Sequence, residues 1–102
     1  MKKKTGDELI YEILSVVEEI PEGYVATYGL IAKLIGREKN SRLVGTALKM
    51  SGLYGEFPCH RVVNHAGRLV PGWTQQYQLL KQEGVTFKNE THVDIKKHIW
   101  RP

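Results

Sequence analysis

Apolar residues recur every three to four positions near the start of the chain, which is the spacing of one face of an α-helix. Thr5 and Glu8 form a capping-box pair before this stretch, and Pro21-Glu22-Gly23 follows it. The apolar positions are Leu9, Ile10, Ile13, Leu14, Val17 and Ile20. We therefore expect a first helix that opens at Thr5, buries one face and ends at Pro21.

Two further helices are predicted after Tyr24-Val25-Ala26. Thr27 is suited to cap a helix that carries apolar residues through Ile35, and Gly36 stands just past its end. After the polar link 37–40, residues 41–50 read as another helix. Its expected inner face consists of Val44, Ala47 and Leu48. Two helices joined by a short polar turn predict a helix-turn-helix.

The second half of the chain is less regular. Residues 61–63 and 68–70 flank Asn64-His65-Ala66-Gly67, and this pattern predicts a small hairpin, or wing. Thr74 is the expected cap of a helix that stops at Gly84, followed by a tail whose form the pattern does not specify. The expected fold is α+β and mostly helical, a winged helix-turn-helix-like single domain spanning residues 1–102.

Composition narrows the class of protein without deciding its function. A net charge of +4 and a pI near 9.3 favour a polyanionic partner but also suit a protein that merely stays in solution. No apolar run is long enough to cross a bilayer, and Met1-Lys2-Lys3-Lys4 is followed by polar residues instead of the apolar core of a secretory signal. The single cysteine fits a reducing compartment, so we expect a cytoplasmic protein.

The candidate chemistry lies in Pro58-Cys59-His60-Arg61. A lone cysteine is most often a small buried hydrophobe. Here a proton acceptor and a positive charge follow it directly, and both favour the thiolate that acts as a nucleophile. Adjacent residues of an extended chain point to opposite faces, so His60 would reach Cys59 through a bridging water. Both interpretations of Cys59 stay open at this point.

An ordered set of motifs then resembles the C-terminal domain of the O6-alkylguanine-DNA alkyltransferases. The most specific is Pro58-Cys59-His60-Arg61-Val62-Val63. The others are Thr27-Tyr28-Gly29, Ser41-Arg42-Leu43-Val44-Gly45 and Leu79-Leu80-Lys81-Gln82-Glu83-Gly84, and the match covers Thr5 to about Val85. The resemblance implies a helix-turn-helix in the minor groove and a damaged nucleotide flipped out of the duplex. It also implies single-turnover transfer of the alkyl group to the cysteine, with no cofactor.

The resemblance gives individual residues expected roles. Arg42 would fill the gap that the flipped base leaves in the base stack; the alternative is an arginine that only contacts a phosphate. Tyr28 would press on the phosphate of the flipped nucleotide; the alternative is an aromatic side chain that packs against the first turn of its helix. The small residues Gly45, Thr46 and Ala47 would let the helix approach the groove, or else serve close helix packing. His60, oriented by Glu83, would take the proton of Cys59, although Glu83 could instead be a solvated charge. Lys49 and Arg61 complete the expected DNA-binding set.

This chain also departs from the family pattern. Only Arg68-Leu69-Val70-Pro71-Gly72-Trp73 stands where the transferases carry a longer loop, and Ser51 replaces their usual asparagine. The N-terminal domain of the longer enzymes has no counterpart. These features resemble the alkyltransferase-like proteins, which usually replace the cysteine with tryptophan or alanine, whereas this chain keeps Cys59.

Two functions therefore remain, a single-turnover methyltransferase and a non-enzymatic lesion sensor that recruits nucleotide excision repair. The retained Cys59, His60 and Glu83 favour transfer, which we expect, and the short loop and the tail favour the sensor. A winged-helix transcription factor would leave the residues around Cys59 unexplained. The histidines and the cysteine do not fall at any common spacing of metal ligands, so we expect no metal site. We expect the histidines of the tail to be solvated. The protein is expected to be a monomer.

Overall fold

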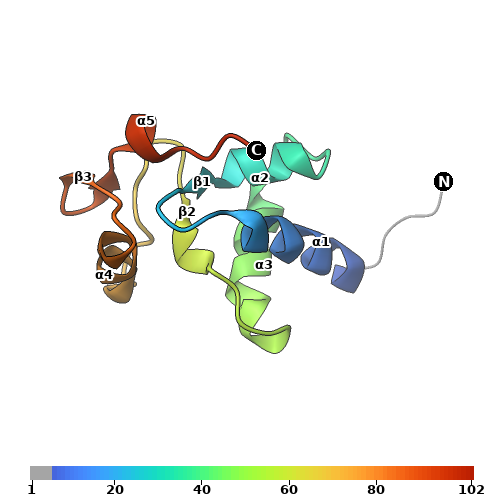
Figure 1. Ribbon diagram of the computed structural model, residues 1–102. Helices are drawn as coiled ribbons and strands as arrows, with labels where there is room; N and C mark the ends of the chain where they lie inside the picture. The colour runs from blue at the N-terminus through green and yellow to red at the C-terminus, as the bar shows by residue number, and fades with distance from the viewer. Residues whose placement is uncertain (1–5) are drawn as a thin grey trace.

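A computed structural model describes residues 6–102, and Thr5, the predicted first cap, lies outside them. The helices are α1 (Gly6–Glu19), α2 (Tyr28–Leu34), α3 (Ser41–Met50), α4 (Gln75–Gln82) and α5 (Ile95–His98), with short 3-10 turns η1 (Ser51–Leu53) and η2 (Cys59–Arg61). The strands are β1 (Ala26–Thr27), β2 (Val62–Val63), β3 (Phe87–Asn89) and β4 (His92–Val93). The architecture is α+β and mostly helical, as the sequence predicts (Figure 1).

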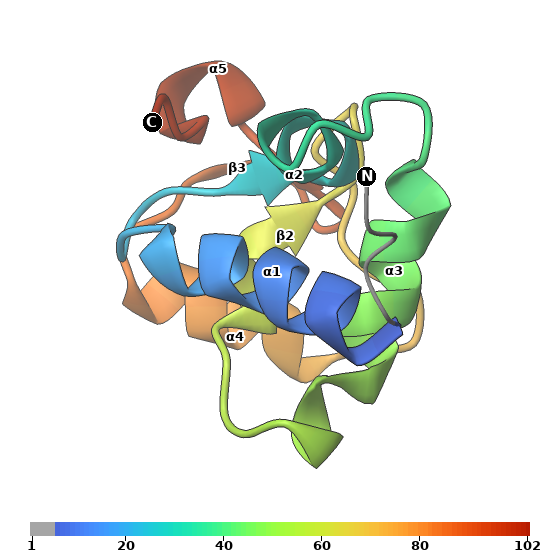
Figure 2. The ribbon, with the colours of Figure 1, turned by 90° about the vertical axis from the view of Figure 1, so that its right-hand side faces the viewer.

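The first three helices pack around the larger hydrophobic core. The apolar face predicted for α1 is buried, and Ile13, Leu14 and Val17 have no exposed surface. This face packs against Ile31 and Ala32 of α2 and Val44 and Ala47 of α3 (Figure 2). Such burial of apolar surface is the main stabilising contribution to a domain of this size. The opposite face of α3 is left at the surface of the molecule.

The helix-turn-helix prediction is confirmed. The Thr27 hydroxyl accepts a hydrogen bond from the Leu30 amide at 3.0 Å, so it caps α2 as expected. Gly36 follows the helix with a φ of +76°, a left-handed conformation that favours glycine. The helix α3 has the predicted bounds, and the short link 37–40 joins it to α2.

The predicted hairpin of residues 61–63 and 68–70 is wrong. Val62 and Val63 pair in parallel with Ala26 and Thr27 instead. Both valines have no exposed surface, and burial on both faces is typical of a parallel strand between other elements. This β1–β2 pairing places the start of α2 beside the segment that follows Cys59.

The antiparallel hairpin of the fold lies in the tail and consists of β3 and β4. Gly67 joins this hairpin to the turn formed by residues 64–67, because the Gly67 carbonyl accepts a hydrogen bond from the Val93 amide at 2.8 Å. A Cβ added at Gly67 would stand 2.7 Å from the Val93 carbonyl oxygen, and its φ is +85°. The close approach therefore requires glycine at this position.

The end of the chain returns to the strand before α2. Val25 pairs with Ile99, and the Trp100 amide donates to the Val25 carbonyl at 2.8 Å. His98 joins this contact, since its Nε2 accepts the Thr86 amide at 3.0 Å and its Nδ1 lies 3.0 Å from the Gly23 carbonyl oxygen. The expectation of a solvated histidine is therefore wrong for His98. No helix in the described part of the chain is long and apolar enough to cross a membrane.

Candidate functional site

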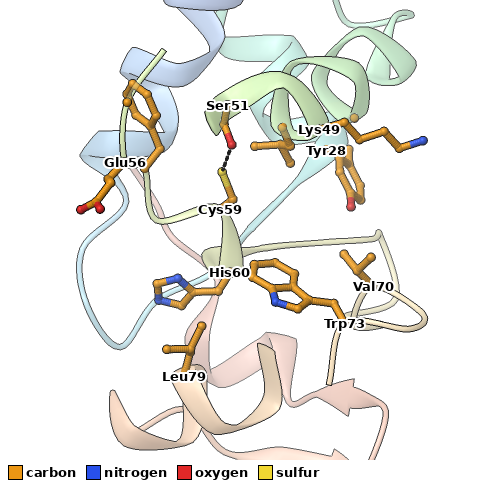
Figure 3. Close-up of a pocket in the computed structure, with 13 residues that line it drawn as sticks. Tyr28, Lys49, Ser51, Glu56, Cys59, His60, Val70, Trp73 and Leu79 are labelled. Atoms are coloured by element: carbon orange, nitrogen blue, oxygen red, sulfur yellow. Dashed lines mark hydrogen bonds between the residues drawn. The ribbon is translucent and has the colours of Figure 1, made fainter. Parts of the chain in front are cut away.

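A cavity of about 590 Å³ opens beside the C-terminal half of α3 (Figure 3). Its lining comes from α2, α3, both 3-10 turns and the loop between them, the loop before α4 and α4 itself. The lining residues are Tyr28, Gly45, Leu48, Lys49, Ser51, Gly55, Glu56, Phe57, Cys59, His60, Val70, Trp73 and Leu79. Five predicted site residues are among them, so the fold brings groups from distant parts of the sequence to one place.

Cys59 stands at the first residue of η2 and points toward the end of α3 (Figure 3). Its thiol donates a hydrogen bond to the Ser51 hydroxyl, with Sγ and Oγ 3.4 Å apart. Burial raises the pKa of the Cys59 thiol, and the hydrogen bond to Ser51 offsets part of that rise. The residue is only half-buried and lines the cavity, so a ligand there can reach the sulfur.

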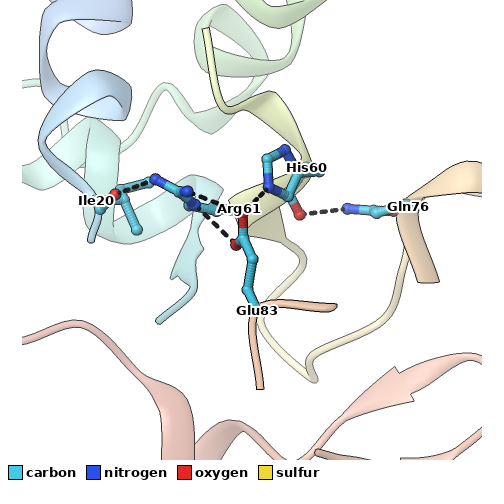
Figure 4. Close-up of polar contacts among 5 residues, drawn as sticks. All are labelled: Ile20, His60, Arg61, Gln76 and Glu83. Atoms are coloured by element: carbon cyan, nitrogen blue, oxygen red, sulfur yellow. Dashed lines mark hydrogen bonds and ion pairs between the residues drawn. The ribbon is translucent and has the colours of Figure 1, made fainter. Parts of the chain in front are cut away.

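Behind the cysteine, Glu83 joins two neighbouring side chains of η2 (Figure 4). Its Oε2 lies 2.8 Å from His60 Nε2 and 2.8 Å from Arg61 Nη2, and its Oε1 accepts from Arg61 Nε at 2.9 Å. The Glu83 side chain is only 12% exposed, which rules out the alternative of a solvated charge. Glu83 therefore holds His60 and Arg61 from the end of α4.

The protonation of this network follows from its geometry. Burial alone would raise the pKa of Glu83, but the hydrogen bonds and charges of Arg61 and His60 outweigh it and lower the pKa. Since the Glu83 carboxylate is ionised, its Oε2 accepts a hydrogen bond from the His60 Nε2–H. In the tautomer that carries its hydrogen on Nε2, the other ring nitrogen, Nδ1, is a hydrogen-bond acceptor, and His60 lines the cavity. Between residues 6 and 102, no hydrogen bond joins Cys59 directly to His60.

Arg61 is placed differently from the DNA-binding role expected for it. Its guanidinium donates to both oxygens of Glu83 and, through Nη1, to the Ile20 carbonyl at 2.8 Å. The side chain is 16% exposed, and the hydrogen bond with Glu83 raises its pKa. Arg61 therefore links η2 to the residues that directly follow α1 and α4. A guanidinium bound in this way inside the molecule is not placed to contact DNA directly.

Ala47 requires a correction. It has no exposed surface and packs into the core with Val44, so it cannot contact DNA in this conformation. Its small size serves close packing between helices, which was the alternative for this set of residues. Helical periodicity had placed Ala47 on the inner face of α3, and the structure agrees with that placement.

The other predicted contacts of α3 do lie at its surface. Arg42, Thr46 and Lys49 are exposed, and Thr46 donates its hydroxyl to the Arg42 carbonyl at 3.2 Å. A Cβ added at Gly45 would meet no atom within 4 Å, so helix packing does not require glycine there. The open space at Gly45 leaves room for another molecule to approach the backbone of α3.

Tyr28 joins the cavity to the start of α2. It packs against the larger core and also lines the cavity, so the packing and the binding interpretations of this residue are compatible. Burial raises the pKa of its hydroxyl, and the nearby Cys59 adds to the rise. The phenol is therefore a neutral hydrogen-bond donor at physiological pH.

Gln76 is a site residue that sequence reasoning missed. It has no exposed surface, and its side-chain amide donates to the carbonyls of His60 and Val62 at 3.1 Å each. Its Oε1 accepts the Val70 amide at 2.7 Å. The signal was its position four residues before Leu80, on the buried face of α4. Thr74, the expected cap of α4, makes no capping hydrogen bond.

Within residues 6–102, no group of three histidine, cysteine, aspartate or glutamate side chains is placed to hold a metal ion. The chemistry of the site lies in one thiol, one imidazole whose Nε2 is held by Glu83, and the Glu83 carboxylate, which Arg61 also binds. This set suits a nucleophile whose proton is taken by a neighbouring base.

Comparison with known proteins agrees with this arrangement. Residues 8–85 match the family model described as 6-O-methylguanine DNA methyltransferase, DNA binding domain. The DNA base-flipping protein of Escherichia coli is 36% identical over 102 residues, covering 97% of this chain and 79% of that protein. A methylated-DNA–protein-cysteine methyltransferase of Methanosarcina acetivorans is 40% identical over 82 residues, which is 78% of this chain and 53% of the enzyme.

A solved structure matches the whole fold. The crystal structure of S. pombe Atl1 in complex with damaged DNA containing O6-carboxymethylguanine has a TM-score of 0.82 and 30% sequence identity. The two chains cover each other completely. With the family model matched over most of its length, this chain belongs to the family defined by the DNA-binding domain of the 6-O-methylguanine DNA methyltransferases.

Proposed function

We propose that this protein binds duplex DNA that contains O6-alkylguanine, holds the extruded base in the cavity beside α3 and transfers its alkyl group to Cys59. The observation that carries the proposal is the thiol of Cys59 in the lining of that cavity. A cavity of about 150 Å³ holds one benzene molecule. The volume of about 590 Å³ therefore has room for a purine with its substituent.

The surface next to the cavity suits a nucleic-acid partner. Arg42 and Lys49 are exposed cations on α3, and Gly45 between them leaves the helix backbone open to close approach. In the proposed complex, α3 lies in the minor groove and Arg42 takes the place of the extruded base in the stack. The relatives described above fit this role, since one is named for base flipping and another was solved on damaged DNA.

The proposed reaction is a single displacement at carbon. Sγ forms a bond to the alkyl carbon while the bond from that carbon to O6 breaks, and the electron pair of the broken bond returns to the purine. The purine takes a proton from water at N1 and becomes guanine. The thiol proton passes to His60 Nδ1 through a bridging water, and the imidazolium then returns it to solvent, which replaces the proton taken by the purine. Protons and electrons therefore balance without a redox cofactor. The product is a thioether, a poor leaving group, so each protein molecule reacts once.

The thiol must lose its proton before it can attack, because the thiolate is the nucleophile. Burial raises the pKa of the Cys59 thiol, and the thiol hydrogen is donated to the Ser51 hydroxyl. His60 supplies the acceptor, and Glu83 stabilises the imidazolium that forms. The proposed reaction needs one copy of the chain, and the free thiol suits the reducing cytoplasm.

A second candidate is a lesion sensor that binds the same base without transfer and recruits nucleotide excision repair. The observation that favours it is the thiol itself, which is protonated, bonded to Ser51 and held without a direct bond to His60 within residues 6–102. The name of the Escherichia coli relative, DNA base-flipping protein, also fits this role.

Intact-mass spectrometry separates the two candidates. The protein is incubated with a duplex that carries one O6-methylguanine, and the same duplex with guanine is the control. Transfer predicts a gain of one methyl group that peptide mapping locates on Cys59. Tight, lesion-dependent binding with no gain in mass would support the sensor and overturn transfer.

A further inference from the structure

The short loop before α4 is a defined turn. The Trp73 amide donates to the Val70 carbonyl at 3.2 Å, and Gly72 has a φ of +85°. Proline at the second position and a left-handed glycine at the third are the signature of a type II turn. Both residues restrict the loop to one conformation, so Val70-Pro71-Gly72-Trp73 presents its two end side chains in a fixed direction.

Gln76 anchors this turn to the segment that carries the cysteine. Its side chain accepts a hydrogen bond from the Val70 amide and donates one to the His60 carbonyl. The backbone amide of Gln76 donates to the Trp73 carbonyl at 3.2 Å. Gln76 is completely buried, and hydrogen bonds of a buried amide are costly to break. The turn is thereby fixed relative to η2, and Trp73 is fixed relative to Cys59.

The Trp73 side chain extends into the cavity. Figure 3 shows its indole reaching from the loop toward the region below Cys59, with Tyr28 on the other side of the cavity. The ring is part of the lining and is not completely buried. An aromatic ring held by a rigid turn next to a thiol is suited to receive a planar ligand.

We propose that Trp73 is a base-binding residue on which the extruded O6-alkylguanine stacks. This inference rests on the proposed function and assigns the stacking surface to a residue of the shortened loop. Stacking of a base on an aromatic side chain does not depend on which base is present. Trp73 therefore favours any purine that enters the cavity, and the fixed distance to Cys59 selects a purine whose O6 substituent can extend toward the sulfur.

The test compares two substitutions of similar bulk. Binding is measured in the Cys59→Ser protein, so that transfer does not consume the lesion, with an O6-methylguanine duplex and the matched guanine duplex. Trp73→Leu fills part of the same space without an aromatic face, whereas Trp73→Phe keeps one. Stacking predicts that Trp73→Leu lowers the preference for the lesion about 5- to 150-fold and that Trp73→Phe restores most of it.

A second readout follows the indole directly. Trp100 is the other tryptophan of the chain and does not line the cavity, so Trp100→Phe leaves Trp73 as the sole indole fluorophore. We expect the lesion duplex to quench this fluorescence and the guanine duplex to leave it nearly unchanged.

The outcomes are distinguishable. An unchanged lesion preference in Trp73→Leu, with unchanged fluorescence on binding, overturns the stacking role and leaves the proposed function standing. Equal loss in Trp73→Leu and Trp73→Phe assigns Trp73 to the wall of the cavity and also overturns stacking. If the protein with both tryptophans shows no preference for the lesion duplex, the proposed function itself fails.

Discussion

The exposed surface of α3 and the polar network behind Cys59 differ in whether their side chains are held by hydrogen bonds within the protein. Arg42 and Lys49 on α3 are exposed, whereas His60 and Glu83 are 14% and 12% exposed and are joined at 2.8 Å. A side chain at the surface is ordered only when its partner binds. Groups that are already held in place lose little entropy during a reaction. The difference indicates that recognition and chemistry reside in separable residues.

Cys59 lies between these two regions and belongs fully to neither. Its hydrogen bond goes to Ser51 at the end of α3, while its neighbour His60 belongs to the polar network. Substitutions should therefore separate binding from transfer and from stability.

Cys59→Ser should abolish alkyl transfer and retain lesion binding, because the sulfur nucleophile is lost while α3 is unchanged. Intact-mass spectrometry and a binding titration on the O6-methylguanine duplex measure the two properties. Loss of binding equal to that of Arg42→Ala would contradict the separation of recognition from chemistry.

Arg42→Ala should weaken binding to the lesion duplex about 5- to 150-fold, the loss expected for one stacked contact. The free energy of unfolding should change by less than about 0.5 kcal/mol, because the side chain is exposed. Arg37→Ala is the matched control, since it removes the same charge from the same helix-turn-helix. It should weaken binding to damaged and undamaged duplexes equally. An equal loss on both duplexes for Arg42→Ala would remove its proposed role in the stack.

Glu83→Gln should destabilise the fold by about 1.5–3 kcal/mol, because it removes the charge that Arg61 and His60 bind. The pKa of Glu83 is lowered in the folded state, so this stabilisation is complete above the unfolded value of about 4.3 and is lost as the pH falls through the folded pKa. Urea unfolding at pH 7 and at acidic pH measures the change.

The pH dependence makes this prediction specific. The difference in stability between Glu83→Gln and the unsubstituted protein should shrink as the pH falls. Glu90→Gln, at an exposed position of the β3–β4 turn, should change stability by less than about 0.5 kcal/mol. A constant difference at all pH values would show that packing, and not the ionised carboxylate, holds the network together.

Gly45→Ala should stabilise the fold slightly, by about 0.5–1 kcal/mol, because alanine favours the helix and its Cβ meets no atom of the described chain within 4 Å. DNA affinity should fall, because the added methyl group stands between the helix and the groove. Gly67→Ala is the contrasting control and should destabilise the fold, since its Cβ would stand 2.7 Å from the Val93 carbonyl oxygen. Unchanged DNA affinity in Gly45→Ala would place the DNA elsewhere.

The parts of the fold that could be predicted from sequence are those determined by local signals. The bounds of α3, the cap at Thr27 and the turn at Gly36 depend on residues within one or two helical turns. The pairing of Val62 with Ala26 depends on residues 36 positions apart in strands only two residues long. Such short strands carry no alternation pattern, and the neighbouring turn at Gly67 suggested a hairpin instead.

The candidate site shows the same limit. The motif around Cys59 located the thiol and the imidazole, and the resemblance added Glu83. The motif could not show that Arg61 binds the same carboxylate from 22 residues away, because a charge in sequence does not reveal its partner. Ala47 shows the converse, since helical periodicity placed it in the core correctly while the resemblance placed it against DNA.

The most direct measurement of the central claim is a covalent trap. A duplex carries one purine with a disulfide-linked tether at its 6-position, and thiol–disulfide exchange with Cys59 requires that this purine enter the cavity. If the extruded purine enters the cavity, a single covalent complex forms through Cys59, and Arg42→Ala forms it much more slowly. If the folded protein binds this duplex without forming the complex, while the unfolded chain reacts with the same tether, then the base does not reach the thiol and the account is wrong.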